Sequence, residues 1–303
     1  MVELNIEDEK YPKLLKEIKN APKKIYVEGN LEILNNPAVT VVGSRNMSEY
    51  GKNITKEIVK DLVKNNIVII SGLAVGIDTV AHKTCIENGG KTIAVIGSGL
   101  NKIFPSENIG LYNEIIKSGG CVISEYEPDV VAQKRFFPMR NRILSGLSLG
   151  TLVMEATYRS GTSITANYAI MQNRKLLCVP NCVGAKNSVG ILNLIKKGAK
   201  LVTSSNDVLF ELGYSNRSFE DDIKLQEEKI KMIEANILID VDEKIKTVYN
   251  YIKEKGITNI DCMLEDLKMD ISSINASVTV LEIKGLVINS DGDKYSVNKN
   301  MVI

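Results

Sequence analysis

The sequence predicts an α/β protein: an extended Rossmann-like domain with a doubly wound, mostly parallel sheet, followed by a small C-terminal winged-helix domain. Short runs rich in β-branched residues alternate with segments of helical spacing through the middle of the chain. These runs are apolar throughout, which is typical of strands in a parallel sheet that helices cover on both faces. Strands and helices joined alternately by short loops form right-handed βαβ crossovers, and these build a doubly wound fold.

The elements of the α/β domain are expected in alternation. The strands are residues 38–43, 67–71, 92–97, 120–124, 151–155, 176–180 and 199–203. The helices between them are residues 48–65, 78–88, 107–117, 137–146, 162–173 and 188–197. In the first helix Ile54, Ile58 and Leu62 fall on one face, as expected for a helix that packs on a sheet.

The chain divides by composition into four segments. Residues 1–36 are expected to form a lead-in that packs on the Rossmann-like domain, which spans 37–213. Residues 214–239 are polar and highly charged, and we interpret them as a linker. Residues 240–303 contain three helical patterns, at 241–256, 257–270 and 271–286, and then an Asp-Gly turn between two short strand-like runs. Three helices and a β-hairpin indicate a winged helix, a relative of the helix-turn-helix.

The composition is that of an ordinary globular protein, with 44% hydrophobic and 25% charged residues. The net charge of +1 excludes a polycation, so a nucleic-acid site would have to be a local patch. The sequence shows neither the apolar core of a secretory signal nor a run of roughly 20 apolar residues that could span a membrane. Five scattered cysteines and a single histidine indicate reduced thiols and no zinc site. We therefore expect a cytoplasmic protein with neither metal nor cofactor.

Gly43, Ser44 and Arg45 directly follow the first strand. A glycine lets a ligand approach the backbone closely, and a hydroxyl beside a guanidinium suits a phosphate oxygen. Open α/β sheets bind ligands at the carboxyl ends of their strands, where this turn is expected to lie. A tight turn with a surface arginine is the simpler alternative.

The second strand is followed by Ser-Gly-Leu-Ala-Val-Gly-Ile-Asp at 71–78, where two glycines precede a helix start that can bind an anion. No G-x-G-x-x-G follows the first strand and no G-x-x-x-x-G-K-[ST] occurs, so neither a dinucleotide site nor a P-loop is expected. Asp78 is expected to cap the helix rather than to act in catalysis.

A basic segment at 129–142 contains two phenylalanines. It has four basic residues and one acid, a balance of +3, around Phe136 and Phe137. Cations for phosphates beside a ring for base stacking are the components of a single-strand binding site. We expect no more than one of the two rings to fill the core.

Two further turns follow strands, Gly97-Ser98-Gly99 and Arg159-Ser160-Gly161-Thr162. In the second, hydroxyls and a glycine stand at a helix start, which favours either phosphate binding or simple helix capping. Because the turns after parallel strands gather at one edge of a sheet, the whole set indicates a polyanion or a nucleotide as the ligand.

Several strings together are more specific than any motif alone: VVGSRNMSEYG, ISGLAVGIDTVAH, IGSGLNKIFPSEN, FFPMRNRILSGLS and EATYRSGTSITA. With residues 190–203 they resemble the DNA-processing protein A (DprA/Smf) family over 10–213, and residues 240–303 resemble its winged-helix tail. The resemblance implies an extended Rossmann fold that binds single-stranded DNA, protects incoming DNA and loads the RecA recombinase in natural transformation. It also implies a homodimer joined through the Rossmann domain.

Most of the expected DNA-binding residues follow from this resemblance, and the last turn adds three. They are Gly43, Ser44, Arg45, Lys134, Phe137, Arg140, Asn141, Arg142, Ser160, Gly161, Thr162 and Lys175. The resemblance makes the first three the phosphate pocket and Phe137 the ring that meets a base. It also implies Lys134 and Lys175 as further phosphate contacts.

Two other functions stay open from the residues alone. A nucleotide phosphoribohydrolase of the lysine decarboxylase-like LOG group shares the fold, but the P-G-G-x-G-T-x-x-E that such enzymes resemble is absent around Gly161. Without a placed acid there is no group for proton transfer, so no enzyme is expected. A transcription factor is disfavoured because residues 240–303 have eight lysines, no arginine and eleven acids, a balance of −3. We therefore interpret that domain as a protein-contact or regulatory element.

Overall fold

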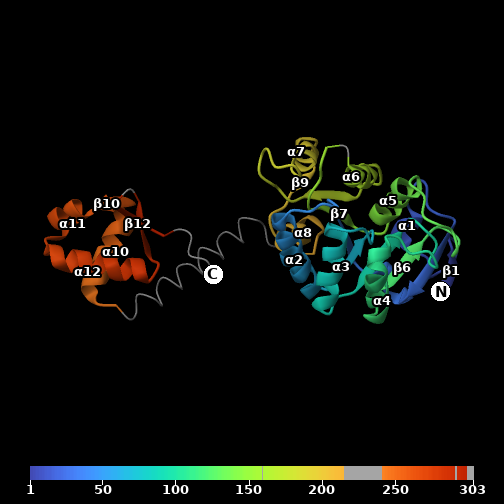
Figure 1. Cartoon of the computed structure of the whole chain (residues 1–303), viewed down its shortest axis with the longest axis horizontal. Helices are drawn as coiled ribbons and strands as arrows, with labels where there is room; N and C mark the ends of the chain where they lie inside the picture. The colour runs from blue at the N-terminus through green and yellow to red at the C-terminus, as the bar shows by residue number, and fades with distance from the viewer. Residues whose placement is uncertain (159, 215–240, 291, 299–303) are drawn as a thin grey trace. The chain divides into compact units, whose positions relative to one another are not determined.

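The computed structural model of the chain describes residues 1–158, 160–214, 241–290 and 292–298. The chain divides into two compact units, Met1–Ser218 and Phe219–Ile303 (Figure 1). The expected linker, 214–239, lies outside the described residues except for Tyr214.

Among the described residues of the first unit, nine strands form one sheet in the order β1-β2-β6-β5-β4-β3-β7-β8-β9. The strands are β1 (Val2–Asn5), β2 (Lys24–Gly29), β3 (Ala38–Val42), β4 (Val68–Ser71), β5 (Thr92–Ile96), β6 (Cys121–Ser124), β7 (Gly150–Val153), β8 (Lys175–Cys178) and β9 (Lys200–Leu201). The seven neighbouring strands β6-β5-β4-β3-β7-β8-β9 are all paired in parallel. The expected Rossmann-like, mostly parallel sheet is confirmed.

The lead-in adds two strands to this sheet. β2 pairs antiparallel with β6, with Tyr26 opposite Ser124, and β1 pairs antiparallel with β2. Ile25 and Val27 of β2 are buried in the same core cluster as Leu15 of α1 (Lys13–Lys16). The lead-in, which was expected to pack on the Rossmann-like domain, is therefore an integral edge of its sheet.

Helices cover both faces of the sheet (Figure 1). Their bounds are α2 (Glu49–Lys64), α3 (Ile77–Glu87), α4 (Ile109–Lys117), α5 (Phe136–Gly146), α6 (Gly161–Met171), α7 (Val189–Lys196) and α8 (Ser205–Glu211). Along β3, Val39 and Val41 pack in one core cluster with α2 and α3, whereas Ala38 and Val42 pack in another with α5 and α6. Alternate residues thus face opposite layers, which explains why the strands are apolar throughout.

One helix of the first unit was not expected. α8 begins in a capping box, in which the Ser204 side chain accepts a hydrogen bond from Asp207 N and the Asp207 carboxylate accepts one from Ser204 N. Its Val208 and Leu209 are buried in the cluster that holds α2. The Ser-x-x-Asp spacing was the available signal for this helix start.

The strand order reverses at β3. From β3 the chain adds β4, β5 and β6 on one side of it, and after α5 it returns to place β7 on the other side. The helices that follow β3 and β7, α2 and α6, pack in different core clusters on opposite faces. The turns at the carboxyl ends of these two neighbouring strands therefore diverge, and a crevice for a ligand opens between them.

The second unit combines three helices with a small sheet. The elements are α10 (Glu243–Lys255), β10 (Ile257–Asn259), α11 (Ile260–Leu267), α12 (Ile271–Ile283), β11 (Val287–Ser290) and β12 (Lys294–Val297). The described strands pair in the order β10-β12-β11, around a core that includes Tyr249, Ile252 and Leu281. The helix expected from residue 257 is corrected, because Ile257–Asn259 pairs with β12 and Asn259 caps α11.

Across both units, no helix in the described ranges has the length and apolarity to cross a membrane.

Candidate functional site

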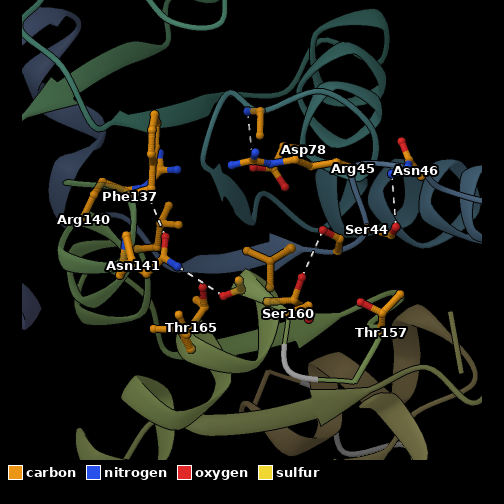
Figure 2. A pocket seen from close by; sticks show the side chains of 18 of the residues that line it. Ser44, Arg45, Asn46, Asp78, Phe137, Arg140, Asn141, Thr157, Ser160 and Thr165 are labelled. Atoms are coloured by element: carbon orange, nitrogen blue, oxygen red, sulfur yellow. Dashed lines mark hydrogen bonds between the residues drawn. The ribbon is translucent and has the colours of Figure 1, made fainter. Parts of the chain in front are cut away.

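A pocket of about 800 Å³ opens where β3 and β7 end, at the switch point of the sheet. Its walls come from the loops that follow β3 to β8 and from α5 and α6. Figure 2 shows Ser44 and Arg45 on one side of the pocket and Ser160 and Asn141 on another. The structure brings ten of the twelve expected residues together here: Gly43, Ser44, Arg45, Lys134, Phe137, Arg140, Asn141, Ser160, Gly161 and Thr162. It leaves out Arg142 and Lys175.

Close backbone packing fixes the turn after β3. A Cβ atom at Gly43 would lie 2.6 Å from Cγ1 of Ile77, so glycine is what allows α3 to approach the turn. Ile77 N donates a hydrogen bond to the Ser44 carbonyl oxygen at 3.2 Å, just after Gly76 with its φ of +85°. From the opposite wall Thr162 Oγ1 donates to the Gly43 carbonyl oxygen at 3.1 Å. The arginine of this turn is therefore presented from a rigid backbone.

Cations dominate the charge of the pocket. Arg45, Lys134 and Lys186 are exposed, and none of them forms an ion pair in the part of the chain that the structure describes. Arg140 lies buried in the lining, and Asp78 is the acid there. Four cations against one acid give the pocket an electrostatic preference for an anion.

The N-terminus of α6 forms part of the wall. Ser160, its N-cap residue, makes no side-chain capping hydrogen bond, and Gly161 and Thr162 line the pocket with it. The first N–H groups of a helix lack intrahelical partners and carry the positive end of the helix dipole, so they favour an anion. Asn141 Nδ2 of α5 donates to the Gly161 carbonyl oxygen at 3.3 Å and supports the turn from below. Arg159 of the same motif lies outside the described residues.

Arg140 lies in the pocket lining but is largely enclosed. It is only 5% exposed, and its Nη1 donates to the carbonyl oxygens of Gly72, at 2.7 Å, and of Val95. Burial lowers its pKa to about 10, although Asp78 opposes the shift, so the guanidinium stays charged at neutral pH. Two backbone carbonyls occupy this nitrogen, so Arg140 ties α5 to the turn after β4 and to strand β5.

Arg142 and Lys175 are not part of the pocket lining. Arg142 Nη1 donates to Glu125 Oε2 at 2.8 Å and its Nε donates to the Asn20 carbonyl oxygen at 2.9 Å, so it joins α5 to the lead-in. Lys175 is the first residue of β8, which places it at the amino ends of the parallel strands, on the opposite edge of the sheet. Its Nζ is 3.4 Å from Glu211 Oε2.

The two neighbouring phenylalanines face different surroundings. Phe136 is buried, and its ring stacks on Tyr126 with 4.1 Å between centroids. Phe137 lines the pocket, with the Arg45 guanidinium 5.9 Å from its ring centroid. One ring fills the core and the other faces the pocket, as the sequence predicted.

Asp78 organises the turn after β4. It lies inside the first turn of α3, whose N-cap residue is Gly76, so the expected helix cap is corrected. Its Oδ2 accepts hydrogen bonds from Gly72 N at 3.1 Å and from Ala74 N at 3.4 Å. Burial raises the pKa of this carboxyl, and Arg140 opposes the shift.

The lining also includes residues that were not among the expected ones, and Phe104, Lys186 and Asn187 are the most informative of them. Phe104 and Lys186 lie in the loops after β5 and β8, so the rule that ligands collect beyond the carboxyl ends of strands was the signal that could have found them. Asn187 Nδ2 donates to Glu155 Oε2 at 3.0 Å and to the Asn46 carbonyl oxygen at 2.9 Å. These two hydrogen bonds stabilise the turn after β3, and no sequence motif predicts them.

The family model for DNA recombination-mediator protein A matches residues 3–213. The chain belongs to this family. The DNA processing protein DprA of Streptococcus pneumoniae is 44% identical over 210 residues, a match that covers 69% of this chain and 74% of that protein. Protein Smf of Synechocystis is 34% identical over 316 residues. This match covers 96% of this chain and 79% of that protein. The expected family is confirmed, and it is a DNA-processing family.

Solved structures of DNA processing protein A have the same fold. The S. pneumoniae structure aligns with a TM-score of 0.66 and 44% identity, over 69% of this chain and 74% of that one. The structure from Helicobacter pylori, which concerns the single-stranded DNA binding mode of that protein, aligns with a TM-score of 0.63 and 30% identity, over 69% and 95%.

Proposed function

We propose that this member of the recombination-mediator family binds single-stranded DNA in the pocket at the switch point of its sheet. The observation that carries the proposal is the convergence of Arg45, Lys134, Lys186 and the ring of Phe137 on one pocket of about 800 Å³. The H. pylori relative, whose single-stranded DNA binding mode has been studied structurally, supports the same ligand.

Both components of a single strand find a matching group. Exposed cations and the uncapped N-terminus of α6 suit phosphates, and the face of Phe137 suits a base. In a duplex the bases are stacked on one another and unavailable to a ring inside a pocket. A flexible single strand can turn a base onto the ring, which is why we infer single-stranded rather than duplex DNA.

We infer that the protein acts by binding and not by catalysis. Asp78 Oδ2 is occupied by two backbone N–H groups. Glu155, which is fully buried behind the turn after β3, accepts hydrogen bonds from Ser48 N and Asn187 Nδ2, both at 3.0 Å. Both carboxyls hold turns in place, and this disfavours the phosphoribohydrolase alternative, which needs an acid free to act on the substrate.

A homodimer joined through the first unit is part of the proposal. On α6, Ile164, Tyr168 and Met171 fall on one face at spacings of four and three residues, and Ile164 and Met171 are exposed together with the neighbouring Ile170. Met139 of α5 is also exposed. An apolar helix face of this kind is typical of a protein–protein contact. We propose that the dimer acts in the cytoplasm and presents the bound strand to the RecA recombinase, as expected from the sequence.

Fluorescence anisotropy with a labelled, unstructured oligonucleotide over a series of salt concentrations tests this function. Arg45→Ala and Lys186→Ala should each weaken binding and reduce the slope of log affinity against log salt by about 1, because each removes one phosphate contact. Lys175→Ala is the matched control, an exposed lysine at the opposite edge of the sheet, and it should change neither quantity. If the three variants and the unsubstituted protein bind with equal affinity, the pocket is excluded as the binding site for single-stranded DNA. Turnover of a nucleoside monophosphate in a parallel incubation would favour the enzyme.

A further inference from the structure

Phe104 is the second aromatic ring at the pocket and the more exposed one. It is 48% exposed in the loop after β5, whereas Phe137 is half-buried against Gly97, where an added Cβ atom would lie 3.1 Å from its ring. The two ring centroids are 5.5 Å apart and the ring planes are tilted by 47°. Rings at this separation are in direct contact, so no base fits between them. Together they form one apolar ledge at the rim.

The loop that carries Phe104 is fixed to the rest of the domain. Gly99 N donates to the Val130 carbonyl oxygen at 2.8 Å, and Asn108 Nδ2 donates to the Leu73 carbonyl oxygen at 2.9 Å. These bonds lie on both sides of Phe104 in the chain. A ring held in this way loses little conformational freedom when a ligand stacks on it. The Phe104 ring is therefore exposed because the fixed loop holds it at the surface, and not because the loop is mobile.

We propose that Phe104 is a second base-stacking position, so that the site takes two adjacent bases of a strand, one on Phe137 and the next on Phe104. This inference rests on the proposed binding of single-stranded DNA. Adjacent bases are about 3.4 Å apart in a stacked strand, and a partly extended strand reaches the 5.5 Å between the rings. Arg45, beside the ring of Phe137, is placed to meet the phosphate of this dinucleotide.

A substitution series separates stacking from simple packing on Phe137. Phe104→Leu keeps apolar bulk against that ring but removes the flat aromatic face, and Phe104→Tyr keeps the face. The leucine variant of the full chain should bind an unstructured deoxythymidine oligonucleotide about tenfold more weakly, with an unchanged salt slope, and the tyrosine variant should bind normally. An abasic oligonucleotide should bind the unsubstituted and leucine proteins equally.

A tryptophan reporter gives a second and independent readout. The chain contains no tryptophan, so Phe104→Trp creates a single tryptophan at the proposed position, and its emission can be excited selectively over that of the tyrosines. Stacking of a base on the indole should quench its emission as the oligonucleotide saturates the protein. Phe210→Trp is the matched control, because Phe210 is 46% exposed on α8 and outside the lining of the pocket, and its emission should not change.

The outcomes separate this inference from the proposed function. Anisotropy that shows no binding to the unsubstituted protein overturns both. Normal binding together with an unaffected leucine variant, or with emission from the Phe104→Trp protein that saturating DNA leaves unchanged, overturns the second stacking position and leaves the pocket in place. Loss of affinity in the leucine variant and quenching confined to position 104 support it.

Discussion

The guanidinium of Arg140 donates a hydrogen bond to the Gly72 carbonyl oxygen at 2.7 Å, and this bond joins α5, which carries Phe137, to the turn after β4. The same nitrogen bonds the Val95 carbonyl oxygen at the end of β5. Three segments thus meet at one buried cation, and two of them, α5 and the turn after β4, line the pocket. The geometry of the exposed groups above it depends on a residue that does not itself reach the rim.

Replacing Arg140 by methionine tests this role. The change keeps apolar volume and leaves two buried carbonyl oxygens without their donor, each of which costs about 1–3 kcal/mol. We expect the free energy of unfolding to fall by about 2–4 kcal/mol in urea titrations. Affinity for single strands should fall as well, but without the reduced salt slope that Arg45→Ala produces. A variant as stable as the unsubstituted protein, with a reduced salt slope, would show that Arg140 contacts phosphate directly.

The adjacent phenylalanines should give opposite phenotypes. Phe136→Ala removes a buried ring stacked on Tyr126 and should destabilise the fold by about 3–5 kcal/mol, with little change in the affinity of the folded fraction. Phe137→Ala removes a ring of the pocket and should lose about tenfold in affinity at an unchanged salt slope. Thermal unfolding and anisotropy on both variants check the pair. Exchanged phenotypes would mean that the two rings had been assigned to the wrong surroundings.

His82 makes stability depend on pH in a defined window. It is fully buried, its Nδ1 lies 2.7 Å from Thr92 Oγ1, and burial lowers its pKa to about 3. Its unfolded value is about 6.5, so below that pH the unfolded chain takes up a proton that the folded protein excludes. The free energy of unfolding should therefore fall as pH drops below about 6.5, by up to about 1.4 kcal/mol per unit.

Because His82 is the only histidine, the test is simple. Urea titrations between pH 6.5 and 5, where most carboxyls are still ionised, should show this slope in the unsubstituted protein. The slope should flatten in His82→Gln. The same slope in both proteins would assign the pH dependence to acidic groups.

The apolar face of α6 predicts the effect of a charge on assembly. Met171 is 76% exposed at the end of that helix, so Met171→Glu should not disturb the fold. Within a dimer interface, however, it would bury a carboxylate, and we expect the variant to sediment as a monomer where the unsubstituted protein forms dimers. Glu57, exposed on α2, provides a control through Glu57→Lys, which should leave sedimentation unchanged. Dimers that tolerate Met171→Glu would place the interface elsewhere.

The sequence predicted where the strands end and therefore which turns line the pocket. It predicted less well in which direction individual side chains point. The turns after β3 and β7 were predictable because apolar runs mark where parallel strands end. The same rule places Lys175, the first residue of β8, at the edge of the sheet opposite the pocket. Arg140 lies three or four residues from the buried Phe136, Ile143 and Leu144, on the same face of α5. This spacing could have predicted that Arg140 is buried.

Other features of the site had no local signal. Phe104 approaches Phe137 only because the loops after β5 and β6 bond to each other, with Gly99 N on the Val130 carbonyl oxygen. The support of Glu155 by Asn187 joins residues 32 positions apart in the chain. Contacts of this kind follow from the complete fold, so periodicity and spacing alone do not reveal them.

The C-terminal unit should contribute little to the affinity for single strands. Residues 240–303 have eight lysines, no arginine and eleven acids, a balance of −3, which opposes binding of a polyanion. The exposed face of α12 includes Ser272, Asn275, Ala276 and Thr279, with no cation among them to meet phosphates. A chain ending at Ser218, the limit of the first compact unit, should bind an unstructured oligonucleotide within about twofold of the full chain, with the same salt slope. A much larger loss of affinity, or a slope lower by 1 or more, would mean that the second unit holds part of the strand despite its charge.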